Sequence, residues 1–110
     1  MSQFMLVLHL DPASRAHLSP EEMQKSLEKY MAWANKPFAK GAQRLSPDPG
    51  KVIRDHGRKI SDGPYSETKE VFGGYYLIEA ADYDEAVKRA LDHPHLEYGG
   101  TMEIRKLFEM

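Results

Sequence analysis

The sequence predicts an α+β domain of the ferredoxin-like type, in which an antiparallel sheet carries two helices on one face. Two segments, residues 3–10 and 74–80, are apolar on both alternating sets of positions, as in strands covered on both sides. Two others, residues 20–38 and 82–91, repeat apolar residues at helical spacing. The elements follow the order strand, helix, one or two strands, strand, helix, strand, which is the order of this fold.

The first helix has a clear beginning. Ser19 offers a capping hydroxyl, a proline follows at the first helical position, and Glu22 completes a capping box. Pro37 ends or bends the last turn, and Gly41 stands where a left-handed residue at a helix end is expected. The predicted apolar stripe consists of Met23, Leu27, Tyr30, Met31, Ala34 and Phe38.

The middle of the chain is predicted to hold a short strand and an extra β-hairpin. Residues 42–46 begin the strand, and the proline-rich and glycine-rich residues 47–50 form a turn. Residues 52–56 and 59–61 flank a glycine turn, which indicates a hairpin. Because this hairpin is polar, we expect it to be an exposed excursion from the sheet.

The second half of the chain repeats helix and strand. Asp82 or Asp84 caps a helix that Pro94 stops, and residues 102–108 alternate as a final strand. The apolar stripe of this helix consists of Tyr83, Ala86, Val87, Ala90 and Leu91.

Composition limits the classes of protein that this chain can be. Its 110 residues fit one domain, residues 1–110, and 41% hydrophobic with 29% charged residues excludes a disordered chain. The longest apolar run, residues 4–8, is too short to span a bilayer and lacks a basic flank, so we expect a cytoplasmic protein without a membrane partner. A formal net charge of -2 offers no basic face for nucleic acid. The absence of cysteine excludes disulfides, thiolate metal sites and cysteine nucleophiles.

A homodimer is predicted from the two strands that are apolar on both faces. Two helices cover only one face of the sheet, which leaves the other apolar face exposed in a monomer. Burial of apolar surface contributes roughly 25 cal/mol per Å², and a second copy can cover this face by using the same surface twice. We therefore expect two chains joined sheet to sheet.

A charged turn followed by a glycine pair carries a family resemblance. The segment DGPYSETKE at residues 62–70, followed by GGYYLI at residues 73–78, resembles the DGPF-type proteins of the YCII-related family. The helix start at residues 84–86 and the terminal strand at residues 103–106 are similar to the family as well. The resemblance covers the whole chain, and the chain departs from the family pattern at Tyr65, where phenylalanine is usual, and at Lys106, where proline is usual.

The resemblance implies a dimeric α/β barrel. It also implies a suspected enzyme, because some family members pair a histidine with an aspartate in a cleft. Related folds include isomerases, monooxygenases and dehydrohalogenases that act on small organic molecules. DGPF-type proteins have no settled reaction, and some occur fused to or beside sigma-factor-like regulators.

The charged turn supplies most of the candidate site residues. Asp62 either accepts hydrogen bonds within its own turn or faces a pocket as a general base, and both roles stay open. Gly63 and Pro64 set the direction of the chain and lie where a ligand would contact the turn. The charges that follow are either ordinary surface residues or a cluster in which a lysine holds an anion while a carboxylate moves a proton: Glu67, Lys69 and Glu70.

Three further residues complete the predicted site. His9 ends the first strand on the face opposite its neighbouring leucines and is a candidate proton carrier, or else a histidine hydrogen-bonded at a strand end. Tyr75 is the tyrosine we expect at the site, as a pocket wall or a catalytic proton donor, because it and Tyr76 point to opposite faces and Tyr75 lies nearer the turn. Arg44 is a candidate for binding a substrate carboxylate, although an exposed strand-edge arginine is the commoner case.

Metal and cofactor sites are not predicted. His93 and His95 lie two residues apart, and no third ligand follows at a diagnostic spacing. The leading interpretation is a cofactor-free enzyme that performs proton transfer or elimination on a small polar organic molecule. The alternative is a non-catalytic module that binds a metabolite or a regulatory partner with the same residues.

Overall fold

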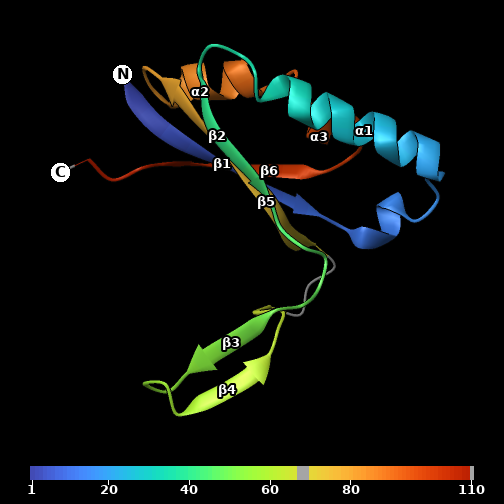
Figure 1. Cartoon of the computed structure of the whole chain (residues 1–110). Helices are drawn as coiled ribbons and strands as arrows, with labels where there is room; N and C mark the ends of the chain where they lie inside the picture. The colour runs from blue at the N-terminus through green and yellow to red at the C-terminus, as the bar shows by residue number, and fades with distance from the viewer. Residues whose placement is uncertain (67–69, 110) are drawn as a thin grey trace.

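The computed structural model describes residues 1–66 and 70–109 and confirms the predicted α+β architecture (Figure 1). The main sheet contains β1 (Ser2–Leu10), β2 (Ala39–Arg44), β5 (Val71–Ala80) and β6 (Thr101–Lys106). Their order is β2-β5-β1-β6, and every neighbouring pair is antiparallel. The helices α1 (Pro20–Trp33), α2 (Tyr83–Ala90) and α3 (Pro94–Glu97) lie on one face of this sheet (Figure 1). A short 3-10 helix, η1 (Pro12–Arg15), follows β1.

The core lies between the helices and the sheet because side chains alternate between the two faces of each strand. The helix-facing residues of β1 and β5 are buried, and they are Phe4, Leu6, Leu8, Tyr76, Ile78 and Ala80. The side chains of Met5, Tyr75 and Leu77 lie on the opposite face and are only partly buried. That second surface of the sheet, which we call the open face, thus presents apolar side chains and carries no helix among the described residues, as the sequence predicted.

Helix α1 begins as predicted and ends earlier. Ser19 accepts from the backbone N–H of Glu22 at 3.1 Å, and the Glu22 side chain completes the capping box. The last helical residue is Trp33, because the chain approaches Pro37, which has no N–H and disfavours helix before it. The predicted cap at Gly41 is wrong: this residue pairs with Leu77 inside β2, and β2 begins at Ala39 rather than at residue 42.

The buried side of α1 also differs from the predicted stripe. Met31 is 72% exposed, whereas Ser26 and Trp33 are almost fully buried. Trp33 packs against Phe38, Tyr76 and His93, with ring centroids 5.5, 5.4 and 4.5 Å away. The C-terminal end of α1 is thereby anchored to the sheet by one large aromatic residue, which apolar spacing alone did not single out.

The second helical region is divided into two helices. Asp82 caps α2 by accepting from the Glu85 N–H at 2.9 Å, as predicted. Pro94 then begins α3 instead of only ending the previous helix, because proline suits the first position of a helix. The side chain of His93 accepts from the His95 N–H and caps this short helix.

The extra hairpin is confirmed and forms a projecting arm. Its strands, β3 (Lys51–Arg54) and β4 (Lys59–Asp62), pair only with each other among the described strands. We call residues 51–62 the hairpin arm; it extends away from the sheet on the side opposite the helices (Figure 1). The radius of gyration is 15.5 Å, compared with about 13 Å for a compact domain of this length. None of the described helices is both long and apolar enough to cross a bilayer.

Candidate functional site

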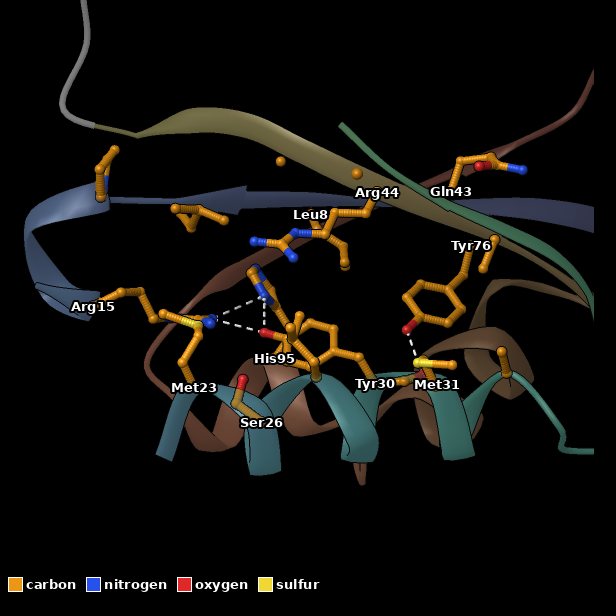
Figure 2. A pocket seen from close by; sticks show the side chains of 17 residues that line it. Leu8, Arg15, Met23, Ser26, Tyr30, Met31, Gln43, Arg44, Tyr76 and His95 are labelled. Atoms are coloured by element: carbon orange, nitrogen blue, oxygen red, sulfur yellow. Dashed lines mark hydrogen bonds between the residues drawn. The ribbon is translucent and has the colours of Figure 1, made fainter. Parts of the chain in front are cut away.

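A cavity of about 660 Å³ lies between α1 and the helix-facing surface of β1, β2 and β5 (Figure 2). Helix α1 forms one side of the cavity from Met23 to Met31, the sheet forms the other side, which we call the floor, and Trp33 packs against Tyr76 of the sheet at the end of the helix. The floor is open because it includes Ala42, Gly73 and Gly74, which have small side chains or none. Most of the remaining wall is apolar and consists of Leu8, Leu10, Pro12, Met23, Leu27, Met31 and Ala34.

The glycine pair creates an irregularity in β5 that shapes the cavity floor. The register of β5 against β1 shifts between Leu8 and His9, so Gly73 is the extra residue of a bulge. A Cβ at Gly73 would lie 2.5 Å from the Leu10 side chain, and one at Gly74 would lie 2.6 Å from the Gln43 carbonyl oxygen. Gly74 also has a φ of 159°. Gly74 therefore requires glycine because the backbone of β2 lies so close, whereas at Gly73 the Leu10 side chain would have to move.

Three polar side chains meet at one wall of the cavity. The Tyr30 hydroxyl oxygen lies 2.7 Å from Nδ1 of His95 and 2.7 Å from Nη2 of Arg15. Nε2 of His95 lies 2.8 Å from the His9 carbonyl oxygen and 3.1 Å from the Thr101 carbonyl oxygen. These residues come from η1, α1 and α3, so only the folded chain assembles them (Figure 2).

The partners of this cluster determine the direction of every hydrogen bond. Carbonyl oxygens only accept, so Nε2 of His95 must carry the proton and donate to them. In the neutral imidazole, Nδ1 is then an acceptor, and the Tyr30 hydroxyl donates to it. Arginine only donates, so Arg15 gives its N–H to the Tyr30 oxygen. The result is a hydrogen-bond chain in which Arg15 donates to Tyr30 and Tyr30 donates to His95.

Burial keeps Tyr30 and His95, the two titratable members of this hydrogen-bond chain, neutral at pH 7. Burial lowers the pKa of His95, an effect partly offset by its hydrogen bond to the His9 carbonyl. Burial raises the pKa of Tyr30, while the hydrogen bond from Arg15 and the charge of Arg44 oppose the rise. The two arginines therefore favour the phenolate form of Tyr30 relative to what burial alone would give.

Of the predicted site residues that the structure describes, Arg44 alone lines this cavity. It is the last residue of β2 and is exposed at the cavity mouth. Its guanidinium group points inward, toward the cluster of Tyr30 and His95 (Figure 2). Its role in binding an anion, which the sequence predicted, stays a prediction.

The charged turn lies elsewhere. Asp62 ends β4, and its exposed carboxylate forms an ion pair with Lys51 across the hairpin arm. Gly63 packs against the chain at Pro49, where an added Cβ would lie 1.9 Å from a carbonyl oxygen, and a cis peptide bond joins it to Pro64. None of the residues Asp62, Gly63 and Pro64 lines the cavity of the same chain.

The remaining residues of the turn are separated from the cavity or not described. Glu70 accepts from the Thr101 hydroxyl at 2.8 Å, at the sheet rather than in the cavity. Glu67 and Lys69 lie outside the described residues. The predicted anion-holding role of this cluster therefore stays a prediction.

His9 and Tyr75 lie on the open face. Nε2 of His9 lies 3.1 Å from a carboxylate oxygen of Glu103 on the adjacent strand β6. Tyr75 pairs with Val7 in β1 and Gln43 in β2, and its side chain points to the same face as Leu77. The cavity instead receives Tyr76, as well as His95, which is held by the backbone carbonyl of His9.

The central cluster was not visible as a unit in the sequence. The sequence predicts Tyr30 as part of an apolar helix stripe, it gives His95 no role beyond a metal site that lacks a third ligand, and it does not single out Arg15. Arg15 and His95 are 80 positions apart, so no local spacing could connect them. Among residues 1–66 and 70–109, no cluster of three His, Asp or Glu side chains is arranged to hold a metal ion.

Comparison with known proteins identifies the family and the fold. The family profile of the YCII-related domain matches residues 3–110. An uncharacterised protein of Rhizobium meliloti (strain 1021) is 43% identical over 49 residues, which cover 44% of this chain and 40% of that protein. The match thus spans less than half of the relative's length.

A solved structure has a similar fold. It is 5-chloro-2-hydroxyhydroquinone dehydrochlorinase (TftG) from Burkholderia phenoliruptrix AC1100, in complex with 2,5-dihydroxybenzoquinone. The TM-score is 0.58 with 12% sequence identity, and the alignment covers 98% of this chain and 95% of the other. At this identity the similarity establishes a shared fold.

Proposed function

The chain belongs to the YCII-related family, and from that membership we propose that it is a cofactor-free enzyme acting on a small polar organic molecule. The reaction is a proton transfer, with or without elimination of a leaving group. The hydrogen bond from Tyr30 to His95 at the wall of an apolar cavity carries this proposal. A cavity of about 660 Å³ lies within the usual range for small-molecule sites. The fold shared with a dehydrochlorinase supports the same class of reaction.

The proposed mechanism uses the directed hydrogen-bond chain. The Tyr30 oxygen takes a proton from the substrate while its own proton passes to Nδ1 of His95. The electron pair of the broken C–H or O–H bond stays on the substrate as an oxyanion, or expels a leaving group that departs with its own bonding pair. Arg15 and Arg44 stabilise the negative charge. The His95 imidazolium keeps its Nε2–H on the two carbonyl oxygens, and it returns the proton through Tyr30 to product or solvent.

We also propose that the working form is a cytoplasmic homodimer. The uncovered apolar face of the sheet and the hairpin arm on that same side support a second copy docked there. The arm exposes Ile53 and Ile60, which are paired across its two strands and are 66% and 68% exposed. An isolated two-stranded hairpin is at best marginally stable in water, so contact with a partner would stabilise it. In this arrangement Asp62, His9 and Tyr75 would belong to the interface between copies.

The reaction is tested with hydroxyhydroquinones, the compounds named for the structural neighbour. Ring-proton exchange of 2-hydroxyhydroquinone in D₂O is followed by NMR, and chloride release from its 5-chloro derivative, which loses HCl to form a quinone, is measured in parallel. We expect the wild-type chain to accelerate at least one of these reactions and Tyr30→Phe to lower the rate by about 10²–10⁴-fold.

Tyr83→Phe is the matched control. The Tyr83 hydroxyl accepts from the Lys106 N–H and lies outside the cavity lining, so its loss should leave the rate unchanged. Equal rates for wild type and Tyr30→Phe would contradict the proposed mechanism. Ligand binding without any reaction would favour the alternative, a non-catalytic metabolite-binding module.

A further inference from the structure

The cavity has an unbalanced charge. Two arginines, Arg15 and Arg44, are among its lining residues, and no aspartate or glutamate of the described part of the chain is. Within residues 1–66 and 70–109, neither arginine forms an ion pair with a carboxylate. Low-dielectric walls strengthen the field of such charges, so the cavity attracts an anion.

The two guanidinium groups approach the same hydroxyl from different elements. Arg15 reaches Tyr30 from η1 through a 2.7 Å hydrogen bond, and Arg44 reaches toward it from the end of β2 (Figure 2). Nε of Arg15 is buried and has no acceptor among the described residues. A buried donor without a partner is uncommon, which indicates capacity for an additional acceptor at this wall.

The rest of the cavity is suited to an apolar body. Leucine, methionine and alanine side chains from α1, β1 and β2 form most of its surface. An inorganic anion or a heavily hydroxylated compound would leave this apolar wall without a partner, whereas a hydrocarbon ring would bury it. Arg15, Tyr30 and His95 form one polar wall, Arg44 lies at the edge of the cavity, and the other polar side chains of the lining are the uncharged Ser26, Gln43 and Tyr76.

Resting on the proposed function, we infer that the substrate is an organic anion with a ring-sized apolar body and a carboxylate, phenolate or enolate oxygen held between Arg15 and Arg44. The ring lies against the apolar wall, and the oxyanion lies beside the Tyr30 hydroxyl. Arg44 is the specificity-determining residue, because its side chain has no ion-pair partner among the described residues and can turn toward the ligand, whereas Arg15 already donates to Tyr30.

Calorimetric titration of the full chain with four probes tests this assignment. 4-Hydroxybenzoate and 2,5-dihydroxybenzoquinone supply an anion on a ring, methyl 4-hydroxybenzoate supplies the ring without the carboxylate, and inorganic phosphate supplies an anion without a ring. We expect at least one of the two ring anions to bind and phosphate not to bind. If 4-hydroxybenzoate is the one that binds, its neutral methyl ester should bind at least tenfold more weakly. Binding of the wild type should weaken as salt increases. Failure of both ring anions to bind, or binding of phosphate alone, overturns the inference.

Variants separate this inference from the proposed reaction. Arg44→Gln should weaken binding of the ring anion at least tenfold and Arg44→Lys should weaken it less, while Arg58→Gln on the hairpin arm should have no effect. Circular dichroism confirms that each variant is folded. Tyr30→Phe should lower the rate of proton exchange by about 10²–10⁴-fold yet keep anion binding within a few fold. Binding that depends on Arg44 without any exchange would refute the reaction alone, and exchange that is indifferent to Arg44→Gln would refute the anion assignment alone.

Discussion

The hydroxyl oxygen of Tyr30 lies 2.7 Å from Nδ1 of His95, although the two residues are 65 positions apart in the chain. This hydrogen bond joins α1 to α3, the helix that precedes β6. Because Nε2 of His95 donates to two backbone carbonyl oxygens, Nδ1 is left to accept from the Tyr30 hydroxyl. The tautomer of His95 and the direction of the Tyr30 hydroxyl are thus set by the fold before any ligand binds.

Replacing Tyr30 by phenylalanine should lower the free energy of unfolding by about 1–3 kcal/mol, because Nδ1 of His95 and an N–H of Arg15 lose their partner. Urea denaturation measures this change, with Tyr83→Phe as the comparison at an exposed site. In ¹⁵N NMR spectra of the wild type, His95 should show a protonated Nε2 and an unprotonated Nδ1. The opposite tautomer would contradict the assignment of Tyr30 as the donor and Nδ1 of His95 as the acceptor.

Stability should fall between pH 6.5 and about 4 because of His93. Burial lowers the pKa of this histidine to about 4, with the charge of His95 acting in the same direction. Between these two pH values the histidine binds a proton in the unfolded chain, where its pKa is about 6.5, but not in the folded chain. The stabilisation is therefore complete above pH 6.5 and is lost as pH falls through about 4. The loss amounts to about 3 kcal/mol.

His93→Asn should flatten this pH dependence. Asparagine can keep the cap on α3 by accepting from the His95 N–H but cannot take up a proton. Urea unfolding between pH 7 and pH 5, where most carboxylates remain ionised, should therefore show a smaller slope for His93→Asn than for wild type. Equal slopes would assign the pH dependence to other groups.

Gly100→Ala should disrupt the candidate site. A Cβ at this position would lie 2.2 to 2.6 Å from three atoms of the His95 ring, which is held by hydrogen bonds on both nitrogens. We expect a loss of about 1–3 kcal/mol in unfolding free energy, typical of overpacking, and displacement of the His95 NMR signals. Gly41→Ala is the control, because its Cβ would meet only Leu77 at an ordinary 3.8 Å.

The proposed dimer makes a prediction about mass. Light scattering coupled to gel filtration at micromolar concentration should give twice the chain mass of 12.6 kDa. Leu77→Lys on the open face, or Ile53→Lys with Ile60→Lys on the hairpin arm, should shift the protein toward the monomer. Leu91→Lys is the control, since Leu91 is 66% exposed and lies just after α2 on the helix side. A monomeric wild type would refute the dimer.

Asp62→Asn tests the role that the sequence predicted for the charged turn. Its ion pair with Lys51 is exposed on both sides, so we expect the unfolding free energy to change by less than about 1 kcal/mol. A substantial loss of proton exchange at unchanged stability and dimer mass would support a direct role for this carboxylate. An unchanged rate of proton exchange would mean that Asp62 contributes only to the ion pair and to the turn.

Local sequence determined the elements of this protein. Short runs that are apolar on both faces predict β1 and β5, the capping box predicts the start of α1, and the glycine turn predicts the hairpin arm, because each depends on residues within a few positions. The apolar character of both faces of β1 and β5 likewise indicated an uncovered sheet surface.

Tertiary structure alone decided which side chains meet in the cavity. Arg15, Tyr30 and His95 carry no shared motif, and each has an ordinary local explanation as a loop cation, a helix-stripe aromatic and a helix-end histidine. They come together because Trp33 anchors one end of α1 and the bulge at Gly73 leaves the floor open at the other. Such a cluster depends on contacts between distant segments, and those are formed only when the sheet and helices pack.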